Sequence, residues 1–320
     1  MTNRTARSKM NYASSLPTRR VAILLGTWNG ASYLLQQLDS YARQTHSDWC
    51  LYVSDDGSKD GSLDVVQHFR SRVSQPVEVV VGPQRGFAAN YLSLVKNPTV
   101  QGDYFAFSDQ DDIWHSDKLE RALAWLEKIP DVVPGLYCSR TDLVDAFGAP
   151  LGRSSLYTRP PSFQNALVEN IGGANTMVFN RATKQLLEQV EGDIVSHDWT
   201  AYQLVTAVGG QIWYDSNPSL CYRQHTSNAV GSNRDLSARL RRIQMLFAGR
   251  FAQWTEINIS ILRKFLPQMT PESQRSLQFF MKARAGVLPS RIYNLKRSGA
   301  YRQTVLGNLG LVIAAMFRRL

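Results

Sequence analysis

The sequence Tyr104-Phe105-Ala106-Phe107-Ser108-Asp109-Gln110-Asp111-Asp112 holds the clearest structural signal in this chain. The apolar run at its start is typical of a buried strand. Three carboxylates then follow within four residues, and such groups repel one another beside an apolar core. A hard divalent cation would offset this repulsion, because Mg²⁺ prefers one or two carboxylates together with substrate phosphates. The alternative is that Asp111 or Asp112 only caps a helix.

The segments before this strand repeat a pattern of buried strand, loop and amphipathic helix. Apolar runs predict strands at residues 21–27, 49–54, 77–81 and 104–107. Helical spacing predicts helices at 32–43, 63–73 and 87–95, and Asp117 with Glu120 resembles a capping box that opens a helix to Lys128. We therefore expect an α/β domain with a mostly parallel central sheet covered by helices on both faces.

Beyond Pro134 the chain becomes a mixture of strands and helices. The patterns predict strands at 135–139, 175–180, 211–214 and 219–222, and helices at 184–190 and 199–208. From Leu236 onward the segments are helical and amphipathic, with an apolar stripe from Leu240 to Phe251. We expect a disordered basic arm at 1–19, an α/β domain at 20–232 and a basic helical region at 233–320.

The composition is that of an ordinary globular protein. The chain has 320 residues and 43% hydrophobic content, which is enough for a large core. Cys50, Cys138 and Cys221 lie far apart in apolar runs, so they suggest neither a disulfide framework nor a zinc site. The acid-free N-terminus resembles a transit peptide but lacks the apolar core of a secretory signal. We expect a cytoplasmic protein.

The net charge of +10 is concentrated near the C-terminus. Residues 1–230 carry 20 Lys and Arg against 23 Asp and Glu, whereas residues 231–320 carry 16 against 3. Basic amphipathic helices fit either a nucleic-acid face or an anionic membrane surface, and the apolar stripes favour the membrane. The expectation is peripheral binding on the inner face of the cell membrane, without nucleic acid. The alternative is a helical bundle that packs on the α/β domain or on a second copy of the chain.

Three polar motifs follow the first, second and fourth predicted strands. They are Gly26-Thr27-Trp28-Asn29-Gly30, Asp55-Asp56-Gly57-Ser58 and Asp109-Gln110-Asp111-Asp112. Ligands bind at the carboxyl ends of strands in an open parallel sheet, so these loops predict one binding site. Asn-Gly and Asp-Gly pairs are also ordinary turn formers, which is the alternative for each motif taken alone.

From Val21 to about Gly231 the chain resembles the family 2 glycosyltransferases of GT-A fold, and within them the rhamnosyltransferase-like group. The resemblance rests on the order and spacing of several short motifs. They are Leu25-Gly26-Thr27-Trp28-Asn29-Gly30, Ser54-Asp55-Asp56-Gly57-Ser58, Gly86-Phe87-Ala88-Ala89-Asn90-Tyr91, Ser108-Asp109-Gln110-Asp111-Asp112-Ile113-Trp114, Gly172-Gly173-Ala174-Asn175, His197-Asp198-Trp199 and Tyr222-Arg223-Gln224-His225-Thr226-Ser227-Asn228.

The resemblance implies a pyrimidine nucleoside diphosphosugar as donor and Mg²⁺ or Mn²⁺ as cofactor. Thr27, Asn29 and Asp55 would line the base and ribose pocket. Asp109 and Asp111 match the D-x-D motif of the family, with Asp109 nearer the ribose and Asp111 nearer the metal. The ion would stabilise the departing nucleoside diphosphate as a Lewis acid.

Other residues that match the family motifs would complete the donor and acceptor sites. Arg85 and Asn90 would help to hold the nucleotide, although a solvated Arg and a helix-start Asn explain them equally well. His225 would be a third metal ligand or a donor to the diphosphate, against the structural role that a lone histidine usually has. Gly172, Gly173 and Trp199 would lie on the acceptor side, with a plain loop and buried packing as the alternatives.

The resemblance also implies an inverting reaction, which needs a base for the acceptor hydroxyl. Asp198 is the candidate base, and its alternative role is to cap the helix that follows. Family members often have Glu-Asp here, and His197 departs from that pattern. The implied activity is transfer of a sugar, L-rhamnose above others, from a dTDP- or UDP-sugar to a glycan or lipid-linked glycan in cell-surface polysaccharide synthesis.

Two other functions remain open from the sequence. A metal-dependent nucleotidyltransferase would also use carboxylates beside a nucleotide, but it should carry a basic Gly-rich loop, and residues 26–30 contain no cation. A non-catalytic nucleotide-binding scaffold at a membrane is the other alternative. Retention of Asp55, Asp109, Asp111 and Asp198 together argues against such a degenerate domain. The C-terminal helices could also form a homo-oligomer.

Overall fold

The computed structural model describes residues 19–225 and 249–320. The predicted basic arm, apart from Arg19, lies outside the described residues. So do the predicted domain boundary at 232/233 and the apolar stripe from Leu240 to Phe247.

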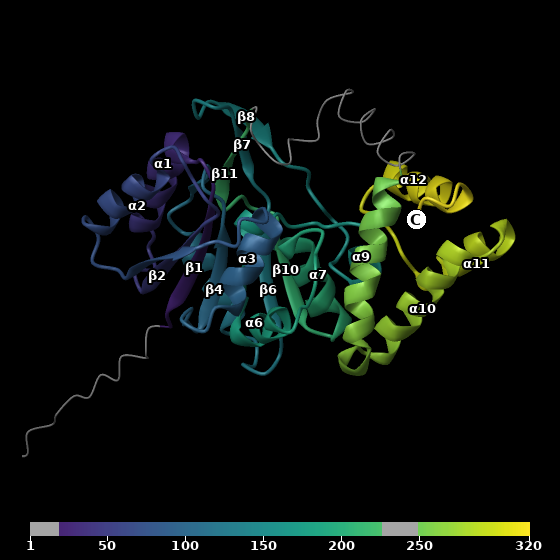
Figure 1. Cartoon of the computed structure of the whole chain (residues 1–320). Coiled ribbons are helices and arrows are strands. Elements are labelled where there is room, and N and C mark those ends of the chain that lie inside the picture. Colours follow the sequence, from purple (N-terminus) through teal and green to yellow (C-terminus); the bar gives the residue numbers. More distant parts are fainter. Residues whose placement is uncertain (1–18, 226–248) are drawn as a thin grey trace, which may run out of the picture.

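A seven-stranded sheet forms the centre of the molecule, with strand order β10-β6-β9-β4-β1-β2-β3 (Figure 1). All neighbouring strands are parallel except β9, which runs antiparallel to both β4 and β6. The prediction of a mostly parallel sheet is therefore confirmed. The strands are β1 (Val21–Thr27), β2 (Trp49–Asp55), β3 (Val77–Val81), β4 (Tyr104–Ser108), β6 (Gly135–Ser139), β9 (Val178–Asn180) and β10 (Gln211–Asp215).

Helices cover both faces of this sheet because β1, β2 and β4 are apolar on both sides. Val21, Ile23 and Leu25 of β1 pack in one apolar cluster with α1, α2 and α4, whereas Ala22 and Leu24 pack in another with α3, α6 and α7. The helices are α1 (Ala31–Ala42), α2 (Ser62–Arg70), α3 (Phe87–Lys96), α4 (Lys118–Leu126), α6 (Arg181–Glu188) and α7 (His197–Ala207), and a short α5 (Phe163–Ala166) packs on α7.

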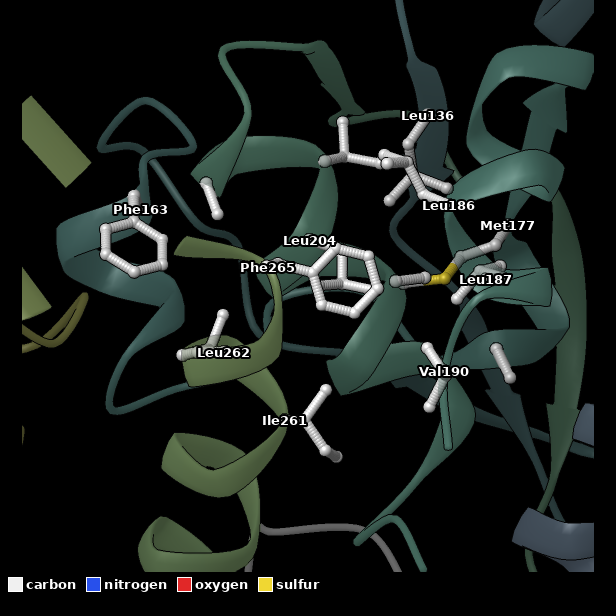
Figure 2. Packing of buried hydrophobic residues seen from close by; sticks show 14 of the residues in the cluster. Leu136, Phe163, Met177, Leu186, Leu187, Val190, Leu204, Ile261, Leu262 and Phe265 are labelled. Atoms are coloured by element: carbon white, nitrogen blue, oxygen red, sulfur yellow. The ribbon is translucent and has the colours of Figure 1, made fainter. Parts of the chain in front are cut away.

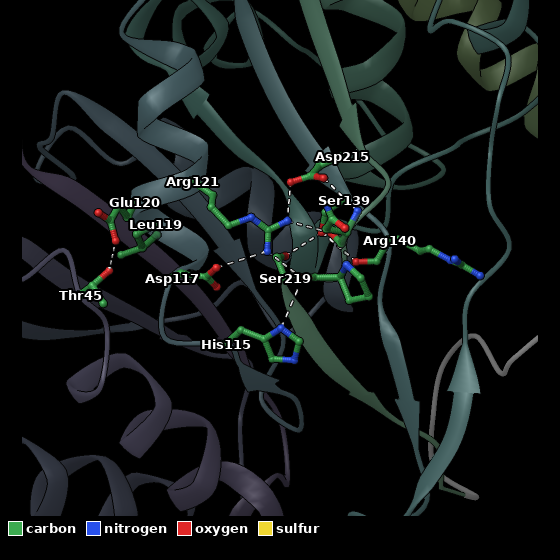
Figure 3. A network of polar contacts seen from close by, with 12 residues as sticks. Thr45, His115, Asp117, Leu119, Glu120, Arg121, Ser139, Arg140, Asp215 and Ser219 are labelled. Carbon is green, nitrogen blue, oxygen red and sulfur yellow. Dashed lines mark hydrogen bonds and ion pairs between the residues drawn. The ribbon is translucent and has the colours of Figure 1, made fainter.

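A second sheet of order β5-β11-β7-β8 was not predicted as a unit. It consists of β5 (Ile113–Trp114), β11 (Leu220–Arg223), β7 (Asp142–Val144) and β8 (Pro150–Arg153). Figure 3 shows the polar network that holds it to the main sheet. The Arg121 guanidinium pairs with Asp215 and donates to the Pro218 carbonyl oxygen, at 2.8 Å. This network fixes β11 beside β5, directly after the acidic cluster.

Two predictions of local structure were wrong in detail. The Asp117 side chain makes no capping hydrogen bond at α4, and Glu120 instead accepts a hydrogen bond from Thr45 at 2.6 Å. The strand predicted at 175–180 begins as a 3₁₀ turn, η1 (Ala174–Thr176), and only β9 is extended. The turn forms because the Thr176 hydroxyl and amide both donate to the Gly173 carbonyl oxygen.

The C-terminal helices pack on the α/β domain and share its core. They are α9 (Arg250–Lys264), α10 (Pro271–Ala285), α11 (Leu288–Ser298) and α12 (Val305–Met316), with the turn η2 (Leu266–Gln268) after α9. Ile261, Leu262 and Phe265 belong to the same apolar cluster as Leu204 of α7 and Leu187 of α6, and Figure 2 shows Phe265 beside Leu204. Within the described residues, none of the helices is both long enough and apolar enough to cross a membrane.

Candidate active site

The carboxyl ends of β1 and β2 meet at one edge of the sheet, where Thr27 lies directly opposite Asp55. Both side chains are buried, and the Thr27 hydroxyl donates to the Asp55 carboxylate at 2.9 Å. The Ser58 hydroxyl donates to the same carboxylate at 2.5 Å, and the backbone amides of Gly57 and Ser58 donate at 3.2 and 2.9 Å. Asp55 therefore orders its own loop and ties that loop to β1.

Asn29 joins the loop after β1 to the loop after β2. Its backbone has a φ of 48°, in the left-handed region that asparagine tolerates better than most residues. Its amide donates to Ser58 Oγ at 2.9 Å, and its side-chain oxygen accepts from the Lys59 amide at 2.8 Å. Asn29 and Asp55 are thus brought together, as the motifs predicted.

Gln110 joins the acidic cluster to the loop after β1. Its side-chain oxygen accepts from the Trp28 amide at 2.8 Å, and its side-chain nitrogen donates to the Trp28 carbonyl at 3.0 Å. The amide lies so close to Gly30 that a Cβ atom there would fall 2.2 Å from Gln110 Oε1. The middle residue of the D-x-D motif is therefore a clamp between two loops, a role that the sequence did not indicate.

Asp109 lies at the end of β4 under strong electrostatic influence from its neighbours. Burial and the charges of Asp111 and Asp198 raise the pKa of Asp109, and the Tyr91 hydroxyl opposes this rise with a hydrogen bond of 2.9 Å. The resulting pKa is about 7. The charge of Asp198 on α7 is therefore close enough to act on Asp109 at the end of β4.

Asp111 and His225 meet across the site. His225 Nε2 lies 2.8 Å from Asp111 Oδ2, and the imidazole stacks on Tyr33 of α1 with ring centroids 4.8 Å apart. Arg223 is buried next to them and donates to the Asp111 carbonyl oxygen at 2.9 Å. It also lies over the Tyr33 ring. The structure thus brings together the two residues predicted as metal ligands.

The donor set at this point fits a cation that is shared with a substrate. Carboxylate oxygens suit Mg²⁺ and Mn²⁺, and imidazole nitrogen binds transition metals. Across residues 19–225 and 249–320, no three His, Cys, Asp or Glu side chains are arranged to hold a metal ion on their own. A cation bound by Asp111 and His225 would therefore need further oxygen ligands, which the phosphates of a donor would supply.

A network of buried polar and charged side chains lies beneath the acidic cluster, and no sequence pattern predicted it. Asp112 is fully buried and accepts hydrogen bonds from the Asn175 side chain at 2.5 Å and the Arg223 amide at 3.2 Å. Lys118 is also fully buried, donates to the Asn175 carbonyl, and lies 3.8 Å from the centre of the Trp114 ring. Burial lowers the pKa of Lys118, and the charges of Asp112 and Asp109 oppose that change.

Asp198 lies in the first turn of α7. The Asp198 carboxylate accepts from the Trp199 amide at 2.7 Å, and the cap position of the helix is Ser196. Trp199 is 7% exposed and donates its indole N–H to the Ala166 carbonyl at 2.7 Å. Trp199 therefore orients α7 from within the core and offers no stacking face to an acceptor, which corrects that part of the acceptor-side prediction.

His197 is buried beside Asp198 between aromatic rings. Its imidazole stacks on Tyr91 at 4.0 Å between centroids and meets Phe107 edge-on at 4.7 Å. In the part of the chain that the structure describes, neither ring nitrogen has a hydrogen-bond partner. Burial lowers the pKa of His197 to about 4, so the ring is neutral. His197 here is an apolar packing residue, not the carboxylate that often occupies this position in the family.

The remaining predicted site residues have structural partners. Asn90 is buried and exchanges two hydrogen bonds with Ser54, at 2.5 and 2.9 Å, so it locks α3 to β2. Arg85 is exposed and pairs with Asp193 at 2.8 Å, which joins the loop before α3 to the loop before α7. A Cβ atom on Gly172 would fall 2.7 Å from the Cys138 side chain, so close packing requires glycine there.

Gly173, by contrast, is exposed at the start of η1, and a Cβ atom on it would meet the Asn175 side chain at 2.8 Å. Since Asn175 holds Asp112, Gly173 supports the acidic cluster from outside.

Comparison with known proteins decides the family of this chain. The family model described as "Glycosyl transferase family 2" matches residues 22–189, just over half of the chain. The chain belongs to glycosyl transferase family 2. The matched segment runs from β1 to the end of α6 and contains Thr27, Asp55 and the whole acidic cluster. The prediction of a glycosyltransferase is therefore confirmed, and Asp198 and His225 lie beyond the matched segment.

Two curated relatives resemble this glycosyltransferase over most of their length. The dTDP-rhamnosyl transferase RfbG of Shigella flexneri is 27% identical over 234 residues, which cover 69% of this chain and 78% of RfbG. The putative teichuronic acid biosynthesis glycosyltransferase TuaG of Bacillus subtilis (strain 168) is 25% identical over 222 residues. Those residues cover 68% of this chain and 84% of TuaG.

Among solved structures, this glycosyltransferase resembles the mannosyltransferase PcManGT from Pyrobaculum calidifontis, solved in complex with GDP-Man and Mn²⁺. The TM-score is 0.51 at 18% sequence identity, and the match covers 94% of this chain and 86% of that one. At this level of identity the similarity concerns the fold alone, and it confirms the predicted GT-A architecture.

Proposed function

We propose that this glycosyltransferase transfers a sugar, with inversion at the anomeric carbon, from a pyrimidine nucleoside diphosphosugar to a glycan or lipid-linked glycan. The donor would be a dTDP- or UDP-sugar. L-Rhamnose is the best supported sugar, because RfbG is named a dTDP-rhamnosyl transferase. Cell-surface polysaccharide synthesis at the cytoplasmic face of the membrane is the setting we infer, since TuaG is named for teichuronic acid biosynthesis.

One observation supports this proposal, namely that carboxylates from two separate elements lie close enough at the sheet edge to influence one another's charge. Asp109 and Asp111 come from the end of β4, and Asp198 comes from α7, yet both Asp111 and Asp198 raise the pKa of Asp109. A transferase needs this arrangement, because charge must be held on the departing phosphate while a base acts on the other side of the sugar.

The donor half of the site would be formed by the loops after β1 and β2. Thr27, Asn29 and Asp55 would hold the base and ribose, and a pyrimidine N–H would compete for the Asp55 carboxylate with the loop groups that it now binds. Asp109 would lie toward the ribose. Arg85 would reach the nucleotide only after leaving Asp193, so we give it a secondary role.

The metal would be held by Asp111 and His225 together with the diphosphate. Such an ion supplies Lewis acidity to the leaving group. The chain's own contribution is to orient these two ligands. Tyr33 supports the His225 ring, and Arg223 fixes the backbone of Asp111.

Asp198 would accept the proton of the acceptor hydroxyl. Its carboxylate is half-buried and sits in the first turn of α7, where the amide of Trp199 holds one oxygen. In the proposed reaction the other oxygen would take the proton from the acceptor hydroxyl, on the side of the sugar opposite the diphosphate.

The test compares Asp198→Asn with Asp193→Asn. Asp193 is an exposed carboxylate in the loop before α7, so its substitution serves as the control. Transfer is measured from radiolabelled dTDP-L-rhamnose and UDP-sugars to an extract of lipid-linked glycans, and donor binding is measured by calorimetry with Mn²⁺. We expect Asp198→Asn to bind the donor normally and to lose transfer by about 10²- to 10⁴-fold. Asp193→Asn should retain transfer. Near-normal transfer by Asp198→Asn would overturn the base assignment.

A further inference from the structure

Helix α12 has two apolar faces, and among the described residues only one of them is packed against the rest of the chain. Leu311, Ala314 and Ala315 are buried against the rest of the C-terminal helices. The opposite face is exposed and equally apolar, at 87% for Val305, 73% for Leu306, 55% for Leu309, 38% for Val312 and 46% for Met316. A helix that is hydrophobic all round is normally buried, so this exposed stripe indicates a surface that becomes covered.

The stripe is free of charge and follows the helical repeat. No charged residue occurs from Val305 to Met316, and the polar side chain in that span, Asn308, is bonded to the backbone of Arg302 and Thr304. The exposed residues 305, 309, 312 and 316 recur every three or four positions, which aligns them along one side. Polar groups therefore do not interrupt the surface.

The last part of the chain carries charges of one sign. Residues 273–320 contain nine Lys and Arg and no Asp or Glu. Arg284 and Arg302 pair with carboxylates from earlier elements. Lys296, Arg297 and Arg318 are exposed, and among the described residues none of them has a carboxylate within ion-pair distance. An apolar strip on a segment with exposed cations is complementary to a surface that is apolar inside and negative outside, which describes an anionic lipid bilayer.

The position of α12 agrees with a role at the active-site side of the molecule. Figure 1 shows α12 at the same upper edge of the molecule as β7, β8 and β11. Strand β11 pairs with β5, which begins directly after Asp112. Phe147, in the turn between β7 and β8, is 95% exposed.

We propose that α12 lies in the plane of an anionic membrane, with its exposed stripe inserted among the lipids. With 12 residues the helix is about 18 Å long, well short of the roughly 30 Å hydrocarbon core, so it cannot cross. This orientation would present a lipid-linked acceptor to the catalytic edge, and in that respect alone the inference rests on the proposed function. Membrane binding itself depends only on α12 and its cations.

Removal of residues 231–320 would be a poor test, because α9, α10 and α12 contribute to the same apolar core as the catalytic domain. Point substitutions on the exposed stripe avoid this problem. Leu306→Gln with Leu309→Gln keeps side-chain length and helix propensity while removing the apolar surface. Val132→Gln is the matched control, since Val132 is 86% exposed in the turn between α4 and β6.

The experiment is flotation of the full chain with vesicles of phosphatidylcholine alone or mixed with phosphatidylglycerol, without donor. We expect binding to the mixed vesicles only, release near 1 M salt, where the Debye length is about 3 Å, and loss of binding by about tenfold or more in the Leu306→Gln/Leu309→Gln variant. The Val132→Gln variant should bind like the original chain. Mn²⁺-dependent dTDP binding should be unchanged in both variants, which shows that they are folded.

Two results would overturn the inference. One is vesicle binding by the double variant that equals that of the original chain. The other is a dimer, measured by light scattering, that the double variant converts to a monomer while vesicle binding stays the same. In that case the stripe joins two copies of the chain. Failure of sugar transfer would bear on the proposed function and leave this result untouched.

Discussion

Substitution of Gly30 by alanine tests the clamp between the loop after β1 and the acidic cluster. Gly30 has a φ of −106°, which alanine adopts without strain, so the backbone itself permits the change. The new Cβ would lie 2.2 Å from Gln110 Oε1, whereas ordinary contacts begin near 3.4 Å. The Gln110 amide must therefore move by about 1 Å, and both of its hydrogen bonds to Trp28 are lost.

Two such hydrogen bonds at a partly exposed site contribute about 1 to 2 kcal/mol together. We expect Gly30→Ala to weaken Mn²⁺-dependent dTDP binding by about 5- to 30-fold, because every 1.4 kcal/mol corresponds to about tenfold in Kd. Calorimetry measures this loss. Gln110→Ala removes the same clamp without adding a Cβ, so it should have a similar effect.

The double variant provides the decisive control. If the clash acts through Gln110, Gly30→Ala should have almost no further effect in the Gln110→Ala background, since the two changes remove the same interaction. A full additional loss in the double variant would refute the reasoning. Such a result would mean that the Cβ disturbs the loop by another route.

Three further predictions concern charges in and below the site. Lys118→Met should destabilise the protein by about 1 to 3 kcal/mol in denaturant unfolding, because it leaves the buried carbonyl oxygen of Asn175 without its hydrogen-bond donor. Asp109 is protonated more readily in the folded than in the unfolded chain, so metal-free protein should lose stability as pH rises from about 4 to about 7. Asp109→Asn should flatten that profile in thermal melts. His197 should change stability with pH in the opposite direction. Its pKa is lowered from 6.5 to about 4 in the folded chain, so the free energy of unfolding should decrease as pH falls from about 6.5 to about 4. His197→Phe should remove this decrease.

The donor half of the site was accessible from the sequence because its residues follow buried apolar runs directly. Once the strand at 21–27 and the strand at 49–55 are parallel neighbours, Thr27 and Asp55 must meet. The same logic located Asp109 and Asp111 at the edge. The D-x-D motif, however, did not show that Gln110 binds Trp28, since that contact depends on loop geometry across 82 residues.

The buried residues that hold the site loops in place could not be predicted from the pattern of apolar and polar residues. Lys118 opens an amphipathic helix and looks like a solvated residue, and its partner Asn175 is 57 residues away. Strand β5 has only two residues, too few for any alternation to predict it. Asn90 and Trp199 were predicted as site residues, but burial directs their polar atoms to Ser54 and Ala166. Tertiary packing, which has no local signal, decides these cases.

The most direct test of the central claim is calorimetric titration of dTDP and UDP into the full chain, with Mn²⁺ and with a chelator. The account predicts binding of a pyrimidine diphosphate that requires the metal and is lost in Asp111→Asn, which removes the carboxylate that faces His225. GDP serves as the purine control and should bind more weakly. Equal binding with chelator present, or unchanged metal-dependent binding by Asp111→Asn, would contradict the account.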